Sequence, residues 1–150
     1  MNRLILLDSG PLGMVTNPKG RGIPAACQQW LKSLLKRGEW IAIPEIADYE
    51  VRRELLRANL LESVQRLDSL KQALEYIPIQ TETMLLAAQL WAEIRQRGQP
   101  TADPKALDGD VILAAQARLL ENETTNVIIA TTNVGHLNRF ITASDWHLID

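Results

Sequence analysis

Short apolar runs alternate with helix-length stretches along this chain. Residues 4–7 and 126–130 have the length and composition of strands that are buried on both faces. Shorter strands are expected at residues 40–43, 76–79 and 146–149, and Pro78 marks an edge strand or a strand end. Apolar residues at steps of three and four predict helices at about residues 24–37, 45–59, 60–74, 83–97 and 108–120.

Strands that alternate with helices predict an α/β protein. The expected fold is a three-layer α/β/α domain with a central parallel sheet and right-handed crossovers, spanning residues 1–150 as one domain. Breaker-rich stretches separate the elements. Residues 9–11 read as a turn and helix entry, residues 17–22 as a loop, and residues 99–104 as a loop that leads Asp108 and Asp110 to the start of a helix.

Composition narrows the class of protein without naming a function. At 150 residues, with 46% hydrophobic and 23% charged residues, the chain suits one globular domain. Its apolar runs are too short to cross a membrane and its amino end does not read as a signal peptide, so a cytoplasmic protein is expected. The single cysteine, Cys27, excludes an intrachain disulfide and a cysteine-rich zinc site, and we expect it to fill the core. A net charge of -2 argues against binding nucleic acid through bulk charge, while local basic patches remain compatible.

Acidic side chains occur where strands end or helices begin. Asp8 directly follows the first apolar run, and Asp110 precedes the run 111–115. In open α/β sheets, ligands bind outside the carboxyl ends of the strands, so acids at that edge are candidate functional groups. Mg²⁺ and Mn²⁺ prefer oxygen ligands and retain several waters, and such ions support phosphodiester hydrolysis. The sequence therefore predicts a divalent-metal site at one edge of the sheet.

The whole chain resembles the PIN domain nucleases, and within them the small VapC-like toxins of bacterial toxin-antitoxin pairs. The resemblance rests on LLDSGPL, IPEIADYEVRREL, LDGDVILAAQA and IIATTNVGHL followed by Phe140, in the order of the family. It implies a ribonuclease whose acids bind one or two Mg²⁺ or Mn²⁺ ions. On this basis Asp8, Glu50 and Asp110 are the expected catalytic and metal-binding residues, and Asp108 is a possible outer ligand.

The fourth motif departs from the strongest family pattern. Asn133 stands where many relatives have Asp, which removes one negative charge and should weaken a second metal. The resemblance implies that Thr131 or Thr132 supports an acid or a metal-bound water. Arg52 and Arg53 are candidate contacts to RNA phosphates. The same resemblance implies a small antitoxin partner and a homodimer, without a membrane partner.

Each of these residues could also serve the fold alone. Asp8, Asp108 or Asp110 could cap a helix, Glu50 could be a solvated helix acid, and Asn133 could form a turn. We expect His136 and His147 to be surface or packing residues, and the tryptophans to lie mostly in the core or an interface. Two other functions are possible: a PIN-like module with an eroded site that only binds RNA or protein, and a receiver-type phosphorylation domain. The second is disfavoured because Asp8 has no paired acid beside it and no lysine follows residues 126–130 closely.

Overall fold

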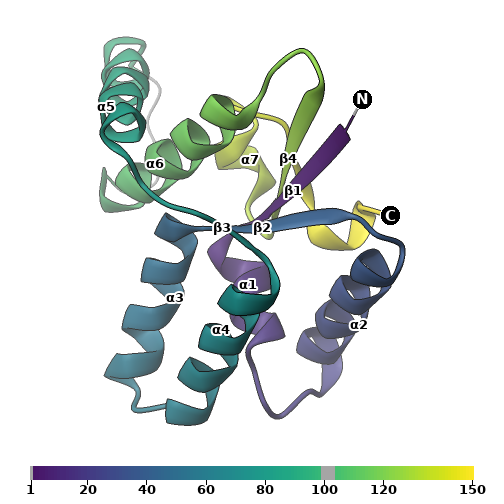
Figure 1. Cartoon of the computed structure of the whole chain (residues 1–150). Coiled ribbons are helices and arrows are strands. Elements are labelled where there is room, and N and C mark those ends of the chain that lie inside the picture. Colours follow the sequence, from purple (N-terminus) through teal and green to yellow (C-terminus); the bar gives the residue numbers. More distant parts are fainter. Residues whose placement is uncertain (1, 99–103) are drawn as a thin grey trace.

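The computed structural model describes residues 2–98 and 104–150, which form one parallel sheet covered by helices (Figure 1). The strands are β1 (Asn2–Leu7), β2 (Trp40–Pro44), β3 (Glu75–Ile77), β4 (Thr125–Thr131) and β5 (Ala143–Asp145). The helices are α1 (Ser9–Val15), α2 (Gly22–Lys36), α3 (Glu45–Arg57), α4 (Leu61–Ala73), α5 (Thr81–Gln96), α6 (Pro104–Leu120) and α7 (Val134–Leu137), followed by a 3₁₀ turn (Trp146–Leu148). The predicted α/β fold with a parallel central sheet is confirmed.

The sheet is five-stranded with the order β3-β2-β1-β4-β5, and every neighbouring pair is parallel. The chain builds outward from β1 to β2 and β3, and then returns to the other side of β1 for β4 and β5. The order therefore reverses between β1 and β4. At such a switch point the connections leave in opposite directions, which opens a crevice at the carboxyl ends of the two strands.

Residues of β1 alternate between the two layers of the core. Leu4 and Leu6 pack with α5, α6 and the residues around α7, whereas Ile5 and Leu7 pack with α1, α2, α3 and α4. Figure 1 shows the same division, with α5, α6 and α7 above the sheet and α1 to α4 below it. Cys27 is fully buried in the second layer, as predicted.

Polar contacts at the β3 edge fix the relation between α6 and α3. The Gln116 side chain on α6 donates to the Ile77 carbonyl at 2.8 Å and accepts from the Ile46 backbone N–H at 3.3 Å. Glu45, at the start of α3, accepts from the Tyr76 hydroxyl at 3.1 Å and from the Ile79 backbone N–H at 2.7 Å. These contacts bring α3 and α6 together at the carboxyl edge of the sheet.

Two boundary predictions are wrong. The last strand is Ala143–Asp145, and the apolar residues after it form the 3₁₀ turn, where Trp146 packs edge-on against Trp30 with ring centroids 5.6 Å apart. Helix α6 begins at Pro104, so Asp108 and Asp110 lie inside a helix rather than at its start. Residues 99–103 of the predicted loop lie outside the described part of the chain. The prediction of an edge strand near Pro78 is confirmed by β3.

No helix in the described ranges combines the length and the apolar character needed to cross a membrane.

Candidate functional site

Asp8 occupies the switch point between β1 and β4. Its backbone N–H donates to the Ala130 carbonyl at 3.0 Å, which joins the ends of the two strands. Its carboxylate accepts from the Ser9 backbone N–H at 2.7 Å and from the Thr131 hydroxyl at 2.7 Å. Asp8 thus caps α1, and its carboxylate is held in a fixed position at the switch point.

Glu50 reaches the same region from α3, which follows β2. The backbone of α6 passes so close that a Cβ built at Gly109 would lie 2.8 Å from Glu50 Oε2. A residue with any side chain at position 109 would displace this carboxylate. Gly109 therefore lets α6 approach the Glu50 carboxylate closely.

Asp110 supplies the third carboxylate, one residue farther along α6. Its side chain is 18% exposed, and Oδ2 is buried without a hydrogen-bond partner. The His136 ring nitrogen Nδ1 lies 3.7 Å from this oxygen, beyond hydrogen-bond distance. A buried carboxylate oxygen without a hydrogen-bond donor destabilises the fold, so this atom is a candidate ligand for a bound group.

All three acids have raised pKa values, with burial as the largest cause. Burial and the charge of Asp8 raise the pKa of Glu50 to about 6, and the same two causes raise the pKa of Asp110 to about 6. Burial also raises the pKa of Asp8, although the hydrogen bonds from Thr131 and Ser9 oppose this change. The cluster therefore concentrates negative charge in a partly dehydrated place, which a cation would stabilise.

The residue types suit a hydrated divalent cation better than a fully enclosed one. Within residues 2–98 and 104–150, no group of three or more His, Cys, Asp or Glu side chains is close enough to hold an ion together. Mg²⁺ retains several of its waters and needs only one or two carboxylates from the protein. The unpartnered oxygen of Asp110 and the mutual repulsion of the three acids are compatible with such an ion.

The other residues singled out from the sequence differ in their exposure and in their contacts. Asp108 is exposed and lines a hollow between α5 and α6 together with Trp91, so the structure does not bring it to the three acids. Asn133 is exposed, its backbone N–H donates to the Thr131 hydroxyl at 2.9 Å, and its amide nitrogen lies 3.2 Å from His136 Nδ1. Thr132 is exposed, and its hydroxyl lies 2.6 Å from the Cβ position of Gly10.

The two arginines near Glu50 differ in their surroundings. Arg52 is bound to two carboxylates, at 3.0 Å from Asp48 and 2.9 Å from Asp68. Arg53 is exposed, with its guanidinium 5.0 Å from the Tyr49 ring centroid, and its charge lowers the pKa of Glu50. Of the pair, Arg53 is the one near the acids and open to solvent.

Sequence reasoning did not assign two basic residues to the site: His136 was expected to be a surface or packing residue, and Arg139 was not singled out. Both lower the pKa of Asp110 through their charges. The sequence signal for a role of His136 was its position. It lies three residues after Asn133 on the short α7, which follows the strand that carries Thr131. The pattern around these residues resembles an ordinary helix end, so their chemistry was not apparent.

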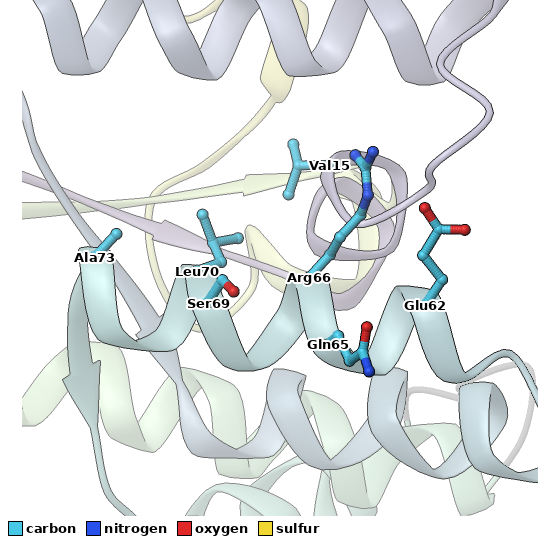
Figure 2. Close-up of a pocket in the computed structure, with 7 residues that line it drawn as sticks. All are labelled: Val15, Glu62, Gln65, Arg66, Ser69, Leu70 and Ala73. Carbon is cyan, nitrogen blue, oxygen red and sulfur yellow. The ribbon is translucent and has the colours of Figure 1, made fainter.

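A hollow lies elsewhere on the molecule, along α4 and facing α1 (Figure 2). It has a volume of about 550 Å³ and is lined by Val15, Glu62, Gln65, Arg66, Ser69, Leu70 and Ala73. Its two charged side chains have opposite signs, and it contains none of the three clustered acids. The acid cluster is thus distinct from this hollow.

Comparisons with known proteins identify the fold. No protein-family model matches the sequence, and no curated protein matches it. Among solved structures, a chain of VapBC2 from Rickettsia felis, bound to a DNA fragment from its promoter, is 19% identical with a TM-score of 0.70, covering 95% of this chain and 98% of that chain. A chain of VapBC-1 from nontypeable Haemophilus influenzae is 15% identical with a TM-score of 0.63, covering 96% and 98%.

A third similar chain comes from DNA-bound VapBC of Salmonella typhimurium, with 19% identity, a TM-score of 0.61, and coverage of 97% of this chain and 99% of that chain. Similarity at this level of identity establishes the fold. The predicted PIN-like α/β/α fold, as in VapC structures of toxin-antitoxin complexes, is confirmed.

The close approach of Gly109 to Glu50 gives a first prediction. Gly109→Ala should weaken Mn²⁺ binding about 10-fold, because the new methyl group displaces the Glu50 carboxylate. The free energy of unfolding should not decrease, because alanine is more favourable than glycine inside a helix by roughly 1 kcal/mol. Titration calorimetry and chemical denaturation measure the two effects. Gly13→Ala in α1 is the matched control, because nothing lies within 4 Å of its Cβ position. Equal Mn²⁺ affinity in both variants would contradict this role of Gly109.

The raised pKa values give a second prediction. Glu50 and Asp110 have ordinary pKa values of 4.5 and 3.8, and both rise to about 6 in the fold. The folded state therefore binds more protons than the unfolded chain between these values, so stability falls as pH rises through this window. In EDTA, these two groups should make the protein less stable at about pH 7.5 than at about pH 5, by ~2 kcal/mol.

Asp110→Asn removes one of the two titrations and should flatten this pH dependence. Urea denaturation of the wild type and the variant at both pH values measures the difference directly. A variant whose pH dependence matched that of the wild type would show that Asp110 does not have a raised pKa.

Proposed function

We propose that this chain is a metal-dependent endoribonuclease and the toxin of a toxin-antitoxin pair. The observation that carries the proposal is the convergence of Asp8, Glu50 and Asp110 at the switch point of a PIN-like fold, where Asp110 presents a buried oxygen without a partner. A parallel sheet alone would not support a nuclease, because one fold serves many activities. The acids and their positions support this one.

In this proposal, Asp8, Glu50 and Asp110 would hold a hydrated Mg²⁺ or Mn²⁺, in part through the waters that the ion retains. When bound, such an ion lowers the pKa of a water and neutralises charge on the leaving oxygen of a phosphodiester. The Thr131 hydroxyl and the Ser9 N–H orient the Asp8 carboxylate and favour its charged form. Asn133 can supply an amide carbonyl oxygen without adding charge. Asp108 has no role at the centre, because its side chain lies toward α5.

The proposed partners follow from the same fold. The three similar chains come from VapBC complexes, which supports a small antitoxin as a partner. RNA is the proposed substrate, and Arg53 is the more accessible of the two arginines near Glu50. A homodimer remains a prediction from the resemblance.

A second candidate is a PIN-like module that binds RNA or protein without cleaving it. Asn133 favours this candidate, because it lacks the charge of Asp and its amide is already close to His136. Metal binding separates the two functions. A nuclease should bind Mn²⁺ through Asp8 and Asp110, whereas an eroded module should not.

The nuclease proposal predicts metal-dependent cleavage by purified protein. With Mn²⁺ or Mg²⁺, the wild type should cut a mixed pool of structured and single-stranded RNA, and EDTA should stop the reaction. Asp8→Asn and Asp110→Asn should each lower the rate by roughly 100-fold or more, because each removes a charged ligand. Asp108→Asn is the matched control: it makes the same change two residues away and should retain most activity.

Cleavage that survives in both Asp8→Asn and Asp110→Asn would indicate a contaminant and overturn the assignment. Absence of cleavage by every sample, together with RNA binding, would favour the binding module.

The toxin proposal makes a separate prediction in cells. Induced expression of the wild type in a bacterial host should arrest growth, because uncontrolled RNA cleavage depletes essential transcripts. Asp110→Asn should restore growth at an equal protein level, measured by immunoblot. Arrest that persists in this variant would show that toxicity does not depend on the acid cluster.

A further inference from the structure

Arg139 has a hydrogen-bond donor that the fold does not use. It is the second residue after α7, its Nε donates to the His136 carbonyl at 3.3 Å, and its guanidinium lies 5.4 Å from the Phe140 ring centroid. Its Nη2 is buried and has no partner. An unsatisfied buried donor costs about 1–3 kcal/mol, so a group that completes it would be bound favourably.

Within the described residues, only one other buried side-chain nitrogen or oxygen lacks a partner, and it is Asp110 Oδ2. Arg139 and Asp110 are joined through His136: the Arg139 Nε donates to the His136 carbonyl, and the His136 Nδ1 lies 3.7 Å from Asp110 Oδ2, so both groups belong to the same site. Arg139 and Asp110 do not form an ion pair within 4 Å. The site thus contains an anionic acceptor, Asp110 Oδ2, and a cationic donor, Arg139 Nη2, and each lacks a hydrogen-bond partner.

A phosphodiester bound together with a cation would satisfy both atoms. The cation would bind the carboxylate oxygen of Asp110, and a phosphate oxygen would accept a hydrogen bond from the guanidinium of Arg139. Arginine is well suited to this contact because its guanidinium is always charged and its donors match phosphate oxygens. Arg52 is bound to two carboxylates, and Arg53 is exposed over Tyr49. Arg139 is the arginine with a buried donor left free.

We propose that Arg139 binds a non-bridging phosphate oxygen of the RNA and positions that phosphodiester beside Asp8 and Asp110. This inference rests on the proposed nuclease function and adds a substrate-binding residue to it.

A purely structural role is the alternative, in which Arg139 only holds the chain around His136 in place beside the acids through its hydrogen bond to the His136 carbonyl. The two roles differ in their effect on metal binding. Removal of a phosphate contact leaves the metal ligands intact, and loss of a nearby positive charge should not weaken the binding of a cation to them. A damaged acid cluster should lose Mn²⁺ affinity together with activity.

The first test measures RNA binding without catalysis. Fluorescence anisotropy follows a fluorescein-labelled single-stranded RNA in EDTA over a series of KCl concentrations. Arg139→Gln should weaken binding about 10-fold and reduce the slope of log affinity against log salt by about 0.7, the value expected for one phosphate contact on a single strand. Arg139→Lys should keep most of the slope, since it keeps the charge.

Arg37→Gln is the matched control. Arg37 is exposed at the end of α2, just before β2 begins, so it lies at the opposite edge of the sheet from the acids. This variant should leave both the affinity and the salt slope near the wild-type values. If Arg139→Gln behaves as Arg37→Gln does, the phosphate contact is disproved.

The second test uses Mn²⁺. Calorimetry should find that Arg139→Gln binds Mn²⁺ at least as tightly as the wild type, while its kcat/KM for RNA falls and Arg139→Lys recovers part of the loss. A parallel loss of Mn²⁺ affinity would assign Arg139 to the structural role instead.

The two proposals can fail separately. If the wild type cleaves RNA and Arg139→Gln cleaves it equally well, the nuclease stands and the Arg139 contact falls. If the wild type cleaves nothing but loses RNA affinity and salt slope in Arg139→Gln, the contact stands and the nuclease falls. If the wild type binds no RNA, the contact is overturned.

Discussion

The hydrogen bond from the Thr131 hydroxyl to the Asp8 carboxylate joins β4 to β1 where the strand order reverses. Everything else in the site is arranged around this contact. It holds one carboxylate at the mouth of the crevice, and the same hydroxyl accepts from the Asn133 N–H, which fixes the chain as it enters α7. Helix α7 and the short segment after it then bring His136 and Arg139 to the site that the acids of α3 and α6 share. A parallel sheet with a different order would separate these elements, because only a reversal leaves the ends of two central strands uncovered.

The site stores unfavourable electrostatic energy that the rest of the fold must offset. Three acids with raised pKa values share one site. Nearby positive charges offset this effect only in part: Arg53 lowers the pKa of Glu50, and His136 and Arg139 lower the pKa of Asp110. Arg52 could have neutralised the cluster but is held by Asp48 and Asp68 instead. Asp48 also accepts from Tyr76, so this arginine belongs to the polar network that ties α3 to α4 and β3. Residues that stabilise the scaffold and residues that leave the site charged are thus neighbours on the same helix, which is a common pattern at functional sites.

Sequence patterns succeeded where one physical term dominates. The runs at 4–7 and 126–130 are apolar throughout because the central strands are buried on both faces, and both are strands in the structure. The prediction of a strand at 146–149 failed because apolar content does not distinguish a strand from a 3₁₀ turn that buries Trp146 against Trp30. Asp8, Glu50 and Asp110 were predictable from motifs and strand ends. Asp108 was not separable from Asp110 until α6 was known to include both, since residues two apart on a helix point in different directions.

Sequence reasoning took His136 for a surface or packing residue and did not single out Arg139. A histidine and an arginine near a helix end are common, and neither follows a recognisable spacing from the acids. Only the fold shows that Arg139 keeps a buried donor free while Asp110 keeps a buried acceptor free. This pair also bears on Asn133. In the proposed nuclease, asparagine in place of aspartate would lower the negative charge of the site and disfavour a second metal ion. With less metal charge to bind the substrate, a fixed guanidinium at Arg139 would be the more important means of holding a phosphate.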